Sequence, residues 1–171
     1  MVHDYIRSRL TGKLACEETN ISGSNFYNQY TSAYDAELFR LFEIKEVAGK
    51  VPDIIGSADL AGVVTSEAAS QCGLLAGTPV FGGVFDVVGA ALTSGIYDST
   101  TLSAVAGTWS IATRIFDRII PSDYPYVWGK FSIPGTFFAH EGSPTSASNL
   151  TWFLPVSYTH LRAHETRSNL V

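Results

Sequence analysis

The chain has 171 residues, with 11 basic and 16 acidic side chains, a net charge of −5 and a pI near 5.2. Because 46% of the residues are hydrophobic and 16% are charged, intrinsic disorder is excluded. The apolar stretches are interrupted well before the roughly 18 residues that a membrane helix needs, so we expect no membrane protein. An acidic chain without a clustered basic face is not expected to bind nucleic acid.

The predicted elements alternate between helices and strands, which indicates an α/β fold. Turn and capping signals in the first half predict four helices, over 3–12, 34–42, 66–71 and 87–95. The first is expected to end at Gly12, and the third to have Thr65 or Ser66 as its N-cap. In the second, Leu38, Leu41 and Phe42 are expected to be buried. Extended segments are expected over 51–56 and 78–83.

Strand patterns dominate from residue 101 onward. Alternation over 101–106 and 109–113 predicts a hairpin with Gly107 and Thr108 at its tip, and 126–132 with 136–140 predicts a second hairpin. Ser143 and Pro144 then predict the N-cap and first residue of a helix.

The last segment, 156–171, differs in composition from the rest and is predicted to be a non-native tail. Its His160 and His164 have the i, i+4 spacing of a metal-binding pair, but we favour a solvated segment. Cys16 and Cys72 lack any metal-binding spacing and are predicted to be reduced thiols, with a disulfide as the alternative. The N-terminal residues lack the pattern of a signal peptide, and we expect a cytoplasmic protein.

Asp86 is the first candidate for chemistry. It follows an apolar strand and two glycines, Gly82 and Gly83, and it precedes an apolar helix. From its residue type alone, either a simple N-cap aspartate or a carboxylate at the mouth of a cleft fits. The tip of the first hairpin, Gly107 and Thr108, is either a plain turn or a phosphate-binding corner.

The order of these segments resembles the FGGY family of carbohydrate kinases, closest to its L-xylulose kinase branch. The resemblance extends from about His3 to Phe153. It is carried by the segments 3–6 (HDYI), 16–22 (CEETNIS), 79–88 (PVFGGVFDVV), 106–109 (AGTW) and 141–146 (EGSPTS).

This resemblance implies an actin-like ATPase (ribonuclease H-like) fold that is incomplete. Residues 1–97 would be the C-terminal part of the sugar-binding domain and 98–155 the beginning of the ATP-binding domain. It implies ATP and Mg²⁺ as cofactors and an L-xylulose-like pentulose as substrate. Asp86 would be the catalytic base and contact the sugar, Gly107 and Thr108 would contact the ATP phosphates, and Asn20 is a further candidate for sugar contact.

The family's N-terminal Asp–Gly–Thr loop and its C-terminal glycine-rich adenosine site are absent from the sequence. We therefore expect this chain alone to be inactive, and the full-length protein to be the form in which a homodimer would occur. A non-catalytic sugar-binding α/β module is the alternative function. A hydrolase that uses Asp86 with Glu141 is a third and weaker hypothesis, because no paired-acid context surrounds them.

Overall fold

The computed structural model describes residues 1–123 and 126–168, with side chains described through residue 159 except at 124–125. His160 and His164 therefore lie outside the described side chains. The first part of the chain folds into short elements: α1 (Val2–Thr11), β1 (Ala15–Glu17), α2 (Glu18–Ile21), β2 (Tyr27–Asn28), β3 (Ala33–Tyr34), α3 (Ala36–Leu41), η1 (Lys45–Val47), β4 (Asp53–Ile55), β5 (Leu60–Val63), α4 (Ser66–Cys72) and β6 (Pro79–Phe81). In this part β1 pairs with β4 in parallel, whereas β2–β3 and β5–β6 are antiparallel pairs.

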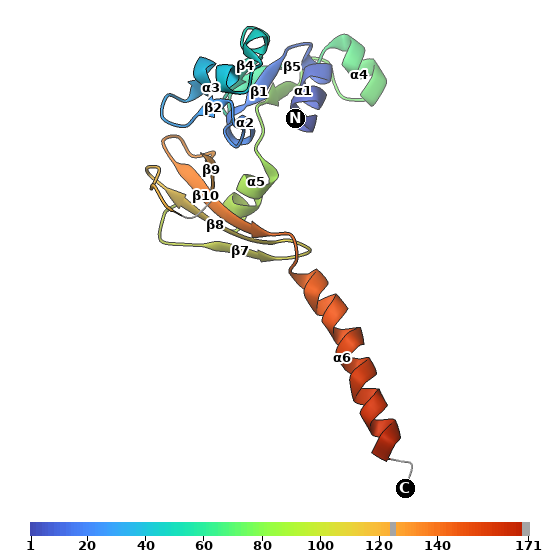
Figure 1. Ribbon diagram of the computed structural model, residues 1–171. Helices are drawn as coiled ribbons and strands as arrows, with labels where there is room; N and C mark the ends of the chain where they lie inside the picture. Colours follow the sequence, from blue (N-terminus) through green and yellow to red (C-terminus); the bar gives the residue numbers. More distant parts are fainter. Residues whose placement is uncertain (124–125, 169–171) are drawn as a thin grey trace.

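Helix α5 (Asp86–Thr93) leads into a four-stranded antiparallel sheet. The sheet consists of β7 (Ser103–Ala106), β8 (Ser110–Phe116), β9 (Val127–Lys130) and β10 (Phe137–Ser143), in the order β7-β8-β10-β9. Figure 1 shows α5 lying against this sheet, below the group of short elements, while the last helix, α6 (Ala147–Ser168), extends away from the sheet.

The two faces of the sheet differ because successive side chains of a strand point to opposite sides. Ile115 and Phe138 face α5 and form a buried core with Val88 and Ala91, together with Ile96 and Phe131. This core joins residues on both sides of the predicted boundary near residue 97, so α5 is fixed directly onto the sheet. The opposite face of the sheet carries Arg114, Phe116 and Trp128, which line a separate cavity.

Local turn and capping signals are confirmed in most places. Gly12 adopts φ 69° and ends α1, while Thr65 accepts a hydrogen bond from the Ala68 amide and is the N-cap of α4. Both predicted hairpins are present as β7–β8 and β9–β10.

The two cysteines do not form a disulfide with each other: Cys16 and Cys72 are both free thiols.

Two predictions about helices are wrong. In α3 the buried residue is Phe39, which stacks on Phe26 at a centroid distance of 4.9 Å, whereas Leu41 and Phe42 are exposed. The last helix starts at Ala147 rather than beside Ser143, because Ser143 is still paired with Ser110 in the sheet.

Candidate functional site

The loop between β6 and α5, residues 82–85, is held by backbone contacts from the first part of the chain. The Gly82 and Gly83 amides donate to the carbonyl oxygens of Asp59 and Ser57, each at 3.0 Å. A β-carbon on Gly82 would lie 2.2 Å from the carbonyl oxygen of Gly56, and Gly83 adopts φ 84°. Both positions therefore require glycine, and together they fix the path of the chain into α5.

Asp86 is the first residue of α5, and Phe85 rather than Asp86 is the N-cap. The carboxylate is exposed, and its Oδ1 atom accepts a hydrogen bond of 2.8 Å from the Val87 amide. A negative charge in the first helical turn is stabilised by the helix dipole. The side chain is also accessible to solvent.

A cavity of about 270 Å³ places Asp86 beside the β7–β8 hairpin. Asp86, Val87 and Ala90 of α5 line one wall, and the other wall consists of Ser103, Val105, Ile111 and Thr113. Ser103 and Thr113 are buried hydroxyl residues that the sequence analysis did not single out. Ser103 is two positions from Val105, and Thr113 is two positions from Ile111, and this i, i+2 spacing is the signal that would have placed them on this face.

Two backbone hydrogen bonds from residues at the start of α6 hold the tip of the same hairpin. The Ser146 amide donates to the carbonyl oxygen of Thr108 at 3.2 Å, and the Ala147 amide donates to that of Gly107 at 3.0 Å. Thr108 itself is exposed, and no hydrogen bond within the described part of the chain uses its hydroxyl. The corner thus presents a free hydroxyl group of the kind that binds phosphate oxygens.

Asn20 does not line the cavity beside Asp86. Its Nδ2 atom lies 3.0 Å from Nδ1 of His3, and its backbone amide donates to Glu17. His3 lines a different cavity, of about 260 Å³, together with Gly82 and Gly83. Asn20 therefore lies outside the set of residues that line the cavity beside Asp86.

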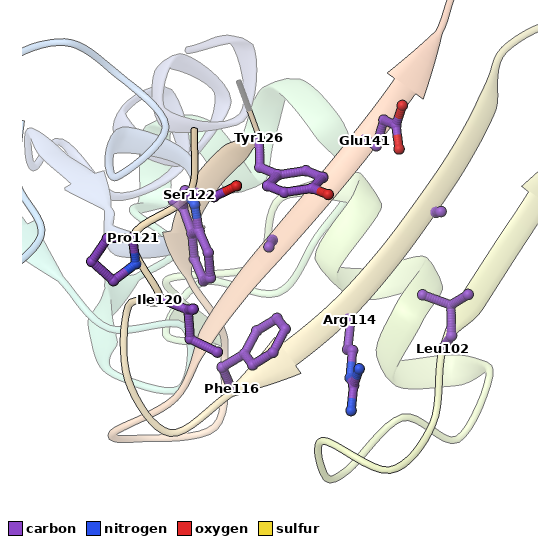
Figure 2. A pocket seen from close by; sticks show the side chains of 11 residues that line it. Leu102, Arg114, Phe116, Ile120, Pro121, Ser122, Tyr126 and Glu141 are labelled. Carbon is purple, nitrogen blue, oxygen red and sulfur yellow. The ribbon is translucent and has the colours of Figure 1, made fainter. Parts of the chain in front are cut away.

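A larger cavity, of about 390 Å³, occupies the opposite face of the sheet. Figure 2 shows Glu141 and Arg114 on its walls with Phe116 and Tyr126, and Asp86 is not among its lining residues. Because Glu141 alternates with the residues that face α5, it points away from the cavity that contains Asp86. The hypothesis of a hydrolase with Asp86 and Glu141 as paired acids is therefore wrong.

Among the residues described here, no group of three or more His, Cys, Asp or Glu side chains is placed to hold a metal ion. Within the same residues, we find no helix with the length and apolar character needed to cross a membrane.

Comparisons with known proteins find similar sequences and a similar fold. The model of the FGGY family of carbohydrate kinases, N-terminal domain, matches residues 1–93. The chain is 50% identical over 155 residues to a probable L-xylulose kinase of Haemophilus influenzae, covering 90% of this chain and 32% of that protein. It is 47% identical over 154 residues to the L-xylulose/3-keto-L-gulonate kinase of Escherichia coli, covering 90% and 31%.

Among solved structures, the xylulose kinase of Rhodospirillum rubrum matches with a TM-score of 0.79 at 27% identity, covering 88% of this chain and 30% of that one. The predicted fold class is thereby confirmed: the chain has part of the actin-like ATPase fold of carbohydrate kinases. It spans about a third of the length of these relatives.

Proposed function

Because this chain belongs to the FGGY family of carbohydrate kinases, we propose that it forms part of the catalytic cleft of an ATP-dependent ketose kinase. The favoured substrate is L-xylulose or a similar pentulose, in keeping with the names of the two curated relatives. The observation that carries the proposal is the shared cavity, in which Asp86 faces the strands of the hairpin whose tip is Gly107 and Thr108.

Asp86 acts as the general base in this proposal. Phosphoryl transfer requires that the attacking hydroxyl be positioned and lose its proton as the bond to phosphorus forms. The Asp86 carboxylate is exposed in the first turn of α5, where it can accept that proton from a bound sugar. Asn20, whose side chain contacts His3, is proposed as a further sugar contact.

Gly107 and Thr108 are proposed to contact the ATP phosphates. The Thr108 hydroxyl is exposed, and the start of α6 fixes the carbonyl oxygens of both residues. Mg²⁺ neutralises phosphate charge when it is bound.

The two curated relatives are about three times as long as this chain, and we propose that the chain alone has little or no activity. ADP release in the presence of L-xylulose and ATP measures this directly. Turnover by the purified chain at the rate of an ordinary kinase would refute the proposal that its cleft is incomplete.

The catalytic proposal is tested in a chimera in which this chain replaces the matching third of the E. coli relative. Asp86→Asn should lower kcat by about 100- to 10,000-fold and retain sugar binding. Glu141→Gln is the matched control, because Glu141 is an exposed carboxylate on the opposite face of the sheet. An active chimera whose kcat is unaffected by Asp86→Asn would favour the sugar-binding module instead.

A further inference from the structure

Glu17, at the end of β1, is fully buried, and its carboxylate accepts four hydrogen bonds. Its Oε1 atom accepts from the Thr19 amide at 2.9 Å and from the Ser57 hydroxyl at 2.8 Å. Its Oε2 atom accepts from the Thr19 hydroxyl at 2.6 Å and from the Asn20 amide at 3.2 Å. Burying an acid without such partners is costly. The four donors therefore explain how the fold accommodates Glu17, and they fix its two oxygen atoms in place.

Thr19 extends this arrangement to the candidate site. Its hydroxyl has one proton, which is directed to Glu17, so the oxygen is left to act as an acceptor. That oxygen accepts a hydrogen bond of 2.8 Å from the Phe85 amide, 66 residues further along the chain. Thr19 is 2% exposed, so water does not readily replace it as the acceptor.

Phe85 is the N-cap of α5 and directly precedes Asp86. The side chain of Phe85 does not cap the helix, and its ring packs beside Phe138 at a centroid distance of 6.3 Å. Because Oδ1 of Asp86 bonds to the neighbouring Val87 amide, the direction of the carboxylate depends on the backbone at this point. The hydrogen bond from the Phe85 amide to Thr19 therefore holds the backbone directly before Asp86.

We propose that Glu17 and Thr19 are positioning residues for Asp86. The inference rests on the proposed function, in which Asp86 is the base. Glu17 orients the Thr19 hydroxyl, Thr19 holds the Phe85 amide, and Phe85 sets the first turn of α5. A purely structural pair would affect stability alone, whereas a positioning pair also affects kcat in protein that remains folded.

The contact itself is tested in the 171-residue chain by amide hydrogen exchange. The Phe85 amide should exchange slowly in the wild type and in Thr19→Ser, which keeps the hydroxyl, and at least about tenfold faster in Thr19→Val. Fast exchange of this amide in the wild-type chain would overturn the proposal, whatever the variants do. The matched control is Thr11→Val, because Thr11 is also buried but its hydroxyl donates to Arg7 within α1.

The effect on catalysis is tested in the chimera with the E. coli relative. Thr19→Val should lower kcat by about 10- to 100-fold with little change in KM for the sugar, since small displacements of a catalytic group have effects of this size. Thr19→Ser should restore most of the rate, and Thr11→Val should not change it. A folded Thr19→Val chimera with normal kcat, or a Thr19→Ser variant as slow as Thr19→Val, would contradict the positioning role.

The two proposals fail in different ways. If Asp86→Asn leaves an active chimera unaffected, the proposed function fails, while the exchange experiment still reports on the contact between Thr19 and Phe85. If Asp86→Asn abolishes turnover but Thr19→Val does not change it, the proposed function stands and the positioning role is wrong. Where Thr19→Val does not fold, a Thr19→Ser chimera with less than a tenth of the wild-type kcat overturns the role.

Discussion

Nη1 of Arg7 donates a hydrogen bond of 2.6 Å to the carbonyl oxygen of Gly82, which connects the first helix to the loop in front of Asp86. Nη2 of the same side chain donates to Asp4 and to the carbonyl oxygen of Ala15, each at 2.6 Å. Arg7 is 4% exposed, so these bonds form away from water. Together with Thr19, this arginine fixes both ends of the 82–85 loop.

We predict that Arg7→Met destabilises the chain by about 3–5 kcal/mol, the usual cost of removing one partner from a buried ion pair. Arg40 pairs with Glu37 at the same i, i+3 spacing, but both side chains are largely exposed. Arg40→Met should therefore leave the free energy of unfolding unchanged within error. Urea unfolding of both variants measures the difference, and equal losses would show that Arg7 does not fix the loop.

Gly82 gives a second prediction about the same loop. A β-carbon at this position would overlap the backbone carbonyl of Gly56, which has no side chain that could move away. Gly82→Ala should therefore cost about 3 kcal/mol or more, at the upper end of the range for overpacking. Gly49→Ala is the control, since nothing lies within 4 Å of a β-carbon there. A Gly82→Ala variant as stable as Gly49→Ala would contradict the close approach of the two segments.

Much of the fold follows from local signals. Gly12, Thr65 and the two hairpin turns were predictable because each depends on residues within about four positions. The errors arose where distant contacts decide. Phe39 is buried because Phe26 stacks on it from a loop, and Ser143 stays in a strand because its partner is Ser110.

The site was predictable only in part. Asp86, Gly107 and Thr108 were identified through the resemblance to a family, because their residue types alone also fit a simple cap and a simple turn. The contribution of Thr19 was not predictable, since it depends on a hydrogen bond to Phe85 across 66 positions. Spacing within the CEETNIS segment gives no indication of which distant amide the threonine meets.

Thr108 gives a prediction that depends on the proposed contact with ATP. Thr108→Ala in the chimera should raise KM for ATP by about 10- to 100-fold, because a hydrogen bond to a charged phosphate is lost, and should leave KM for the sugar unchanged. Thr108→Ser should resemble the wild type. Thr101→Ala, at an exposed position before β7, is the control. If the KM for the sugar rose and the KM for ATP did not, the proposed contact of Thr108 with the ATP phosphates would be wrong.

His140 makes the stability of the sheet depend on pH. It lies on β10, its ring stacks on that of Phe138 at a centroid distance of 5.2 Å, and its buried Nδ1 atom has no hydrogen-bond partner among the described residues. Burial lowers the pKa of His140 below its ordinary value of 6.5. Between the two pKa values only the unfolded chain binds the proton, so acidification through the ordinary histidine range should destabilise the fold.

We therefore expect the contribution of His140 to stability to be complete above about pH 7, to fall as the pH drops below 6.5, and to level off below the folded-state pKa. The slope from this residue does not exceed about 1.4 kcal/mol per pH unit. Urea unfolding at pH 7.5, 6.5 and 5.5 measures it. His140→Phe should remove that part of the slope, whereas His3→Gln should keep it, because His3 lies on α1 and does not contact the sheet core. An unchanged slope in His140→Phe would mean that the imidazole takes up its proton in the folded sheet as readily as in the unfolded chain.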